Sequence, residues 1–192
     1  MALNRLKSMT AYLSGPIDDD PDRGVAWRDE ITPFLTGMNV NVINPLKHTF
    51  YGIQELNEVK RPLIASLLEQ GNIEEVHQEI KQFIRWDLHS VDISTFVIVN
   101  YDTNFHMCGT YQELFTAARE HKPVLLVCKK PINKLSMWIY GIVEPQYMFP
   151  SWDDLKAYLK RINSDPNYEM TEVDKRKWIF FDGAHMTEGG LQ

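Results

Sequence analysis

The sequence predicts an α/β sandwich in which a central, mainly parallel sheet of about five strands is flanked by helices. Two observations lead to this prediction. Short apolar runs alternate along the chain with longer segments of helical periodicity, and each run is closed by residues that break regular structure. Alternation of strand and helix is the pattern of a parallel sheet whose faces are covered by helices.

Two strands and the helix between them are predicted near the N-terminus. The apolar run Met9–Leu13 stops at the loop 14–16, which reads Ser-Gly-Pro. Apolar residues at helical spacing follow from Val25 to Leu35. The run Val40–Ile43 then predicts a second strand, closed by Asn44-Pro45.

The middle of the chain combines an irregular segment with a long helix. From residue 47 to residue 71 glycines and a proline interrupt any period, so we expect an irregular insertion, a long loop or short helices, that covers one side of a pocket. Helical spacing returns from Ile73 to Arg85. This helix is expected to deliver Asp87 near its end.

The second half predicts two further strands around a helix. Thr95–Asn100 reads TFVIVN and Pro123–Cys128 reads PVLLVC, with a helical stretch from Thr110 to Glu120 between them. Trp152–Ile162 predicts a helix capped by Ser151.

The C-terminal segment, residues 164–192, is predicted to be an extension of the same single domain, which spans residues 1–192. Within it, Trp178–Phe181 predicts a last short strand, and Lys175–Lys177 a solvated turn before that strand. A chain of 192 residues with 44% apolar residues can bury one sizeable core.

Composition excludes several classes of protein. A net charge of −6 argues against a nucleic-acid surface, which needs a local excess of Lys and Arg. Cys108 and Cys128 are too few for a disulfide framework and lack the companions of a zinc site. There is no apolar stretch of membrane-spanning length and no secretory signal at the start, so we expect a cytoplasmic protein without a membrane partner.

Candidate chemistry lies in the loops after the strands, because ligands of open parallel sheets bind beyond the carboxyl ends of the strands. The third such loop, residues 101–110, opens a helix that carries Glu113. Asp87 and Tyr12 can approach the same edge of the sheet. A carboxylate pair with a phenol suits glycosidic chemistry, in which one carboxylate attacks or stabilises the anomeric carbon and the other handles protons.

Structural alternatives exist for both carboxylates. Thr110 and Glu113 are three residues apart, which is also the spacing of a helix-capping box. Asp87 could be a solvated acid at a helix end or a partner of Arg85.

Four segments together resemble the nucleoside 2-deoxyribosyltransferase superfamily, whose relatives include deoxynucleoside monophosphate N-glycosidases. Their order and spacing carry the resemblance, which spans roughly Met9 to Val127 and agrees with a Rossmann-like, flavodoxin-like fold. The segments are YLSGPI at 12–17, RWDLHSVDISTFVIVNYD at 85–102, CGTYQEL at 108–114 and HKPVLLV at 121–127.

The resemblance implies a role for each of the three side chains. Glu113 would attack C1′ of a 2-deoxyribosyl group and form a covalent ester. Tyr12 would hold that carboxylate in line, and Asp87 would exchange a proton with the departing and incoming bases. This chemistry requires no metal and no organic cofactor.

The resemblance also implies a set of substrate-binding residues in the loops, with the loop after the first strand and the turn 45–48 as the two walls of the base pocket. The set is Ser14, Gly15, Ile17, Asp18, Pro45, His48, Asn104, Gly109 and Thr110.

One position departs from the superfamily pattern. Members usually have a polar residue six positions before the nucleophile, where it reads the 5′ end of the substrate, and here that position is Met107. The 5′ group must then be read by Asn104, by His106 or by the backbone of Gly109 and Thr110.

Aromatic residues leave two questions open. Trp27 and Trp86 could stack on a base or belong to the core. The aromatic tail 178–181 could complete the pocket of a neighbouring subunit, in a homodimer or higher oligomer, or form an edge strand of its own subunit.

The sequence therefore favours transfer of 2-deoxyribose between nucleobases. Hydrolysis of a (deoxy)nucleoside 5′-monophosphate to base and sugar phosphate would use the same residues. A non-catalytic nucleotide-binding module is a third possibility, because fold does not imply function.

Overall fold

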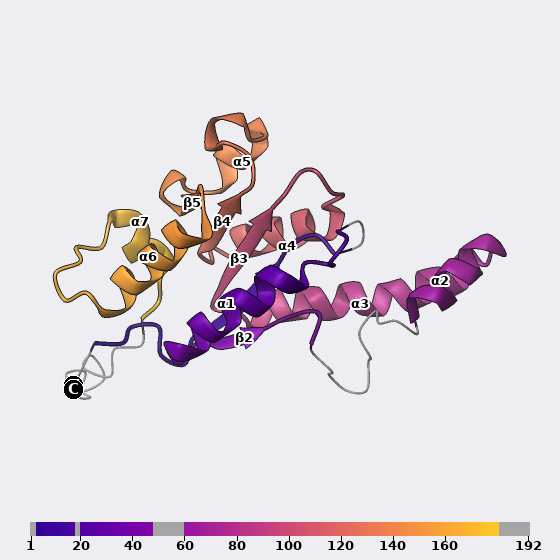
Figure 1. Cartoon of the computed structure of the whole chain (residues 1–192), viewed down its shortest axis with the longest axis horizontal. Helices are drawn as coiled ribbons and strands as arrows, with labels where there is room; N and C mark the ends of the chain where they lie inside the picture. The colour runs from indigo at the N-terminus through magenta and orange to yellow at the C-terminus, as the bar shows by residue number, and fades with distance from the viewer. Residues whose placement is uncertain (1–2, 18–19, 48–59, 181–192) are drawn as a thin grey trace, which may run out of the picture.

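A computed structural model describes residues 3–17, 20–47 and 60–180 of the chain. Five parallel strands form one sheet in the order β2-β1-β3-β4-β5, with helices around it (Figure 1). The predicted α/β sandwich with a parallel sheet is therefore confirmed. The strands are β1 (Thr10–Ser14), β2 (Asn41–Ile43), β3 (Phe96–Tyr101), β4 (Val124–Cys128) and β5 (Met148–Phe149).

Helices cover both faces of the sheet. On one face Trp27 of α1 stacks on Trp152 of α6, with ring centroids 5.1 Å apart. On the other, α3 packs against α4, and both contact β1. The helices are α1 (Val25–Gly37), α2 (Lys60–Glu69), α3 (Ile73–Ile93), α4 (Cys108–Arg119), α5 (Met137–Ile142), α6 (Trp152–Ser164) and α7 (Glu172–Lys177), with short 3₁₀ turns at Ile132–Lys134 and Pro145–Tyr147.

The core lies along the central strands, because a strand between two helical layers must be apolar on both faces. All six residues of β3 are buried, as are all five of β4. Register places Tyr12 of β1 beside Val97 of β3 and beside Ile43 of β2. The segment Tyr12-Leu13-Ser14 therefore sits at the carboxyl end of β1, in the middle of the molecule.

Helices α2 and α3 extend away from the sheet (Figure 1). Residues 60–69 of the predicted irregular segment 47–71 are the helix α2. Helix α3 continues to Ile93, so Asp87 lies six residues before its end rather than near it. The helical spacing of apolar residues is weak after Arg85, because one of the two buried residues in the last part of α3 is the small, polar Ser90. The other is Val91.

The C-terminal prediction was wrong in two respects. Residues 178–180 form no strand, because the Trp178 side chain is buried, with its ring 5.1 Å from that of Phe96. The fifth strand is instead β5, whose two residues are too few to give a periodic signal. Lys175–Lys177 form the last turn of α7, where the helix dipole favours cations, and not a turn before a strand. Phe181 lies outside the described residues.

Within the three described ranges no helix is long and apolar enough to cross a bilayer. Over the same ranges, no group of three or more His, Cys, Asp or Glu side chains is arranged to hold a metal ion.

Candidate active site

Glu113 is the centre of the candidate site. Its side chain is only 8% exposed, and both of its oxygens accept hydrogen bonds from β1. The Tyr12 hydroxyl donates to Oε1 over 2.8 Å, and the Ser14 hydroxyl donates to Oε2. Residues two apart on a strand point to the same face, so Tyr12 and Ser14 both face α4.

Helix α4 does not use Glu113 as a cap. The helix begins at Cys108 and its N-cap is Met107, which makes no side-chain cap hydrogen bond. Thr110 is therefore already inside the helix and Glu113 is in its second turn. The capping-box alternative is wrong, because the Glu113 carboxylate is engaged by the sheet and not by its own helix.

Burial controls the acid strength of this carboxyl. Loss of water raises the pKa of Glu113, while the hydrogen bonds from Ser14 and Tyr12 and the charge of Arg28 lower it in part. Burial, followed by the nearby charge of Glu113, also raises the pKa of Tyr12 well above its ordinary value. The phenol therefore remains protonated and remains a hydrogen-bond donor.

Asp87 supplies the second carboxyl group from α3. Burial and the charge of Glu113 raise the pKa of Asp87 to about 8, although the charge of Arg28 opposes this shift. At neutral pH the group is therefore mostly a protonated acid. Such an environment differs from that of a solvated acid at a helix end.

The surroundings of the two carboxyl groups therefore favour different protonation states. Glu113 accepts two hydrogen bonds that favour its ionised form, whereas burial and the charge of Glu113 favour the neutral form of Asp87. One ionised and one protonated carboxyl group are what nucleophilic attack at an anomeric carbon with protonation of the leaving group requires.

The described start of the first loop, residues 15–17, directly follows Ser14 at the end of β1. Ser14, which stays a predicted substrate-binding residue, donates its hydroxyl to Glu113. Gly15 is tightly enclosed, since a Cβ there would lie 3.0 Å from the Trp27 ring and 3.1 Å from Asn100 Cβ. Ile17 is half-buried.

The other expected substrate-binding residues are placed less uniformly. Pro45 is half-buried in the turn after β2, and Asn104 is exposed, with its backbone N–H donating to Asp102 Oδ1. Gly109 is exposed, and a Cβ there would meet no atom within 4 Å, so a ligand can approach this backbone. The Thr110 residue is buried. Asp18 and His48 lie outside the described residues.

The remaining aromatic and loop residues divide between core and surface. Trp27 belongs to the core, stacked on Trp152 with an interplanar angle of 20° and with the Arg28 guanidinium 4.4 Å from its ring centroid. Trp86 packs near His89 on α3. His106 is exposed in the loop before α4.

Two features of the site were missed in the sequence. The first is Ser14 as a second donor to Glu113, which follows from the alternation of side chains along β1. The second is Arg28, whose side chain is completely buried. Its signal was its place at the spacing of the core-facing residues Ile31 and Leu35, where an apolar residue would be expected.

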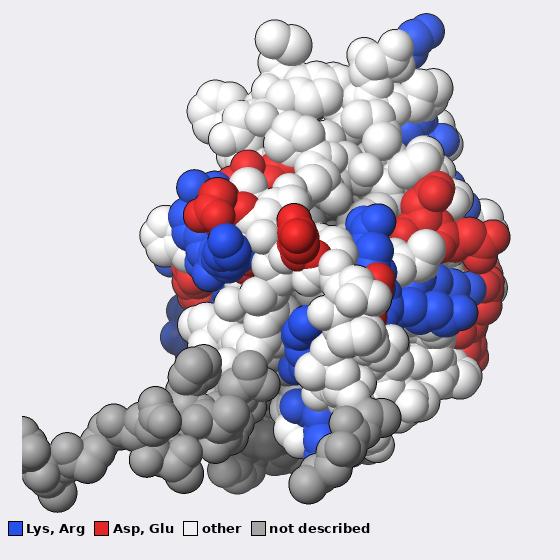
Figure 2. All heavy atoms as spheres, turned by 90° about the vertical axis from the view of Figure 1, so that its left-hand side faces the viewer, with Lys and Arg blue, Asp and Glu red and all other residues white. Residues whose placement is uncertain are grey.

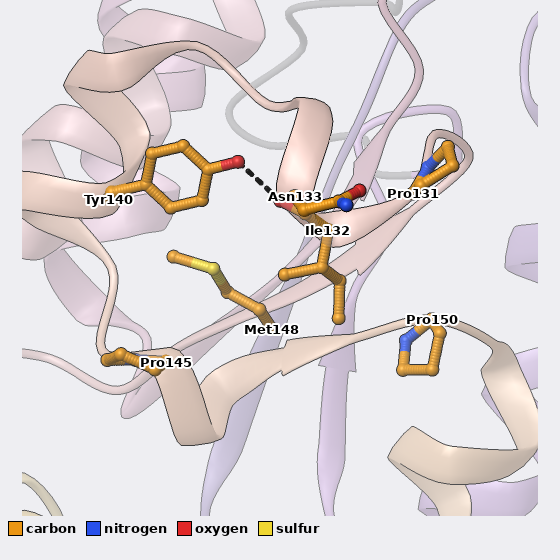
Figure 3. A pocket seen from close by; sticks show the side chains of 7 residues that line it. All are labelled: Pro131, Ile132, Asn133, Tyr140, Pro145, Met148 and Pro150. Atoms are coloured by element: carbon orange, nitrogen blue, oxygen red, sulfur yellow. Dashed lines mark hydrogen bonds between the residues drawn. The ribbon is translucent and has the colours of Figure 1, made fainter.

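A separate hollow lies at the other edge of the sheet, by β5. Its volume is about 840 Å³, and it contains none of the candidate site residues. Figure 3 shows Tyr140, Met148 and Ile132 around it. In Figure 2 the upper part of the molecule is largely free of Lys, Arg, Asp and Glu, whereas charges of both signs mix lower down. The lining residues are Pro131, Ile132, Asn133, Tyr140, Pro145, Met148 and Pro150.

No family model matches the chain, and no curated protein matches it. Among solved structures, the chain is similar to a 2-deoxyribosyltransferase from Bacillus psychrosaccharolyticus, with 16% identity over 85% of this chain and 95% of that one and a TM-score of 0.44. It is also similar to a 2-deoxyribosyltransferase from Leishmania mexicana, with 17% identity over 78% of this chain and 95% of that one and a TM-score of 0.44. At these identities and TM-scores, neither similarity by itself assigns an activity to this chain.

Proposed function

We propose that the protein is a nucleoside 2-deoxyribosyltransferase that exchanges the nucleobase of a 2′-deoxynucleoside through a covalent deoxyribosyl-Glu113 intermediate. The observation that carries the proposal is the buried Glu113 carboxylate, held by Tyr12 and Ser14 beside a second carboxyl group that is protonated at neutral pH. The motif resemblance of the sequence supports the same family of reactions.

In the first half-reaction a Glu113 oxygen attacks C1′ of the sugar. The new C1′–O bond forms as the C1′–N bond to the base breaks, and the electron pair of that bond goes to the base nitrogen. Asp87 donates its proton to the departing base and becomes a carboxylate. Glu113 is then a neutral ester, so the site never holds two buried charges of the same sign for long.

The second half-reaction reverses these steps with another base. Its nitrogen attacks C1′, the ester bond breaks, and Glu113 regains its charge. Asp87 recovers a proton from the incoming base. The enzyme returns to its starting state, as a ping-pong exchange requires.

Hydrolysis is the second candidate, with water in place of the incoming base. The superfamily resemblance implies a polar residue six positions before the nucleophile for a 5′-monophosphate substrate, but Met107 is 4% exposed and packs in the core. This observation favours a nucleoside over a nucleotide as the substrate. The loop 101–110 or the first turn of α4 would then recognise the 5′ end of the nucleoside.

Product analysis by liquid chromatography separates the candidates. Purified protein is incubated with deoxyinosine, deoxyuridine or their 5′-monophosphates, with and without free adenine or cytosine. A new deoxynucleoside that appears only when free base is present supports the transferase. Base release that does not depend on an acceptor would replace it with the hydrolase, and binding without any turnover would favour the nucleotide-binding module.

We also propose that the protein is a homodimer or a higher homo-oligomer. The tail residue Trp178 cannot serve a neighbouring pocket, because it is buried in its own subunit and donates its Nε1–H to the Tyr158 hydroxyl. The helices α2 and α3 are better candidates, since they project from the sheet with large apolar side chains exposed. These are Leu63 (50% exposed), Leu68 (51%), Ile73 (61%), Ile84 (43%) and Ile93 (51%).

Light scattering tests the oligomer directly. A dimer has twice the 22.4 kDa mass of one chain. We expect Ile73→Asp to shift the mass to that of the monomer, whereas Ile179→Asp, which changes an apolar residue that is 68% exposed outside these helices, leaves it unchanged. A wild-type protein that is monomeric at micromolar concentration would refute the proposal.

A cytoplasmic location stays a prediction of the sequence.

A further inference from the structure

Arg28 is the largest side chain that is fully buried in the described part of the protein. It is the fourth residue of α1. A buried guanidinium is costly, because it has lost its hydration. An arginine at this position therefore needs a reason beyond packing.

The hydrogen bonds of Arg28 hold the backbone on both sides of Ser14. Its Nε–H donates to the carbonyl of Leu13 over 3.3 Å, and Nη2 donates to the carbonyl of Gly15 over 3.0 Å. Nη1 donates to the carbonyls of Arg23 (3.2 Å) and Gly24 (3.1 Å), which joins the loop to the start of α1. All four bonds end on backbone carbonyl oxygens.

Ser14 lies between the two carbonyls that Arg28 holds in the strand-loop segment, and it is one of the two donors to Glu113. The other donor, Tyr12, directly precedes Leu13 in the chain. A shift of this backbone would move both hydroxyl groups at once. The guanidinium therefore acts on the nucleophile through two residues, Ser14 and Tyr12, which both donate hydrogen bonds to Glu113.

The charge of Arg28 acts on the same groups. Burial lowers the pKa of Arg28 to about 10, so it is still a cation at neutral pH. The groups that face it electrostatically are Tyr12 of β1, Glu113 of α4, Asp87 of α3 and Asp20 of the loop before α1. Its charge favours the ionised forms of Glu113 and Asp87.

We propose that Arg28 is a positioning residue for the nucleophile: its guanidinium holds the backbone on both sides of Ser14, so that Ser14 and Tyr12 keep Glu113 aligned for attack. The inference rests on the proposed function for the identity of the attack. It goes beyond that function because it assigns a positioning role to a residue of α1, a helix that contains none of the proposed catalytic side chains.

Two variants separate the hydrogen bonds of Arg28 from its charge. Arg28→Lys keeps the charge but cannot span two carbonyl groups, and Arg28→Gln keeps an amide donor but loses the charge. We expect both to lower kcat by about 10²-fold, as a displacement of the reacting groups by about 1 Å does. Both should move the acid limb of the kcat/KM profile to higher pH, because Ser14 and Tyr12 favour ionised Glu113, and Arg28→Gln should move it further because it also removes a nearby positive charge.

Ile31→Ala is the matched control. Ile31 is one turn further along α1, 1% exposed, and has a side chain without charge or hydrogen-bonding groups. This variant destabilises the fold, but we expect its folded molecules to keep the wild-type kcat and pH profile. If the Arg28 variants, corrected for their folded fraction, lose no more activity than Ile31→Ala, the proposal is overturned.

A titration without turnover makes the result independent of the proposed reaction. The side-chain carboxyl of Glu113 is followed by ¹³C NMR and assigned by comparison with Glu113→Gln. We expect a higher midpoint in both variants, with the larger shift in Arg28→Gln, and an unchanged midpoint in both would overturn the proposal. If Arg28→Gln does not fold, the kcat of Arg28→Lys decides. A wild type that turns over no substrate refutes the proposed function, while the titration still decides the role of Arg28.

Discussion

In the described part of the protein, two of the buried carboxylates, Glu113 and Asp174, have surroundings that shift their pKa in opposite directions. Glu113 receives two hydroxyl hydrogen bonds near β1, and its pKa is raised. Asp174 of α7 is fully buried beyond β5, and its pKa is lowered. The donors to Asp174 are the hydroxyls of Tyr147, Tyr158, Tyr168 and Thr171, the amide of Gln146 and the backbone N–H of Thr171.

The number of donors explains the difference. Burial raises the pKa of Asp174 too, but the hydrogen bonds from Tyr168, Tyr158, the Thr171 backbone and Tyr147 outweigh it. Asp174 is thereby an anion with its hydrogen bonds satisfied, and it fastens α7 to the turn before β5 and to α6. Glu113 has two hydroxyl donors and the charge of Arg28 against a larger loss of water, so its pKa stays raised and it remains more basic, as a nucleophile should.

The same chemical change at both sites should therefore have opposite effects, and Glu113→Gln should have the largest. The amide fills the same volume but cannot attack C1′, so we expect turnover to fall on the order of 10³-fold or more, as for other essential nucleophiles. The melting temperature should not fall, because a buried charge is removed. Full activity in this variant would remove Glu113 from the mechanism.

Asp174→Asn tests the other of these two carboxylates. The amide cannot accept all the hydrogen bonds that Asp174 accepts, so we expect a loss of about 3 kcal/mol in the free energy of unfolding. Urea denaturation measures this loss. Because the wild-type carboxylate has a lowered pKa, its contribution is present above the pKa of the unfolded chain and is lost as the pH falls through the folded value. Activity per folded molecule should be unchanged, and a specific loss of kcat would show that the two sites are coupled.

The raised pKa of Asp87 predicts two pH dependences. Activity should fall as the pH rises through about 8, because Asp87 then can no longer protonate the leaving base. Stability should also fall between about pH 4 and pH 8, because the folded state holds a proton that the unfolded chain releases. Asp87→Asn should remove both trends and melt several degrees higher than the wild type at pH 8, but not at pH 4. Equal melting curves at pH 8 would contradict the assigned environment.

Ser14→Ala should have the smallest effect. Loss of one hydrogen bond to a charged group costs about 1.5–3 kcal/mol, which corresponds to a decrease in kcat of roughly 10- to 10²-fold. The acid limb of the activity profile should move to higher pH, because a donor that favours ionised Glu113 is gone. Ser94→Ala is the control, since Ser94 is also buried but donates to the carbonyl of Val91. Equal kcat values for the two variants would show that Tyr12 alone holds the nucleophile.

Sequence reasoning succeeded where the signal is local. The central strands were visible because each is a short apolar run between breakers, and α6 was visible with its cap, where Ser151 accepts a hydrogen bond from the Asp154 N–H. It failed for β5 and for residues 178–180. Two residues of strand carry no period, and an aromatic run has the same composition whether it pairs as a strand or fills a core.

The sequence by itself determined the alternation of strands and helices and the residue types that stand at the carboxyl ends of the strands. Only the tertiary structure decided that Glu113 meets Tyr12 across a separation of 101 residues and that Arg28 holds the loop beside them. The physical reason is that periodicity reports which neighbours along the chain share a face, whereas burial, hydrogen-bond partners and pKa depend on which strands pair. Glu113 and Asp174 are both acids three residues after a threonine. The tertiary structure gives Glu113 a reactive environment and gives Asp174 a structural one, in which it caps α7 with Thr171.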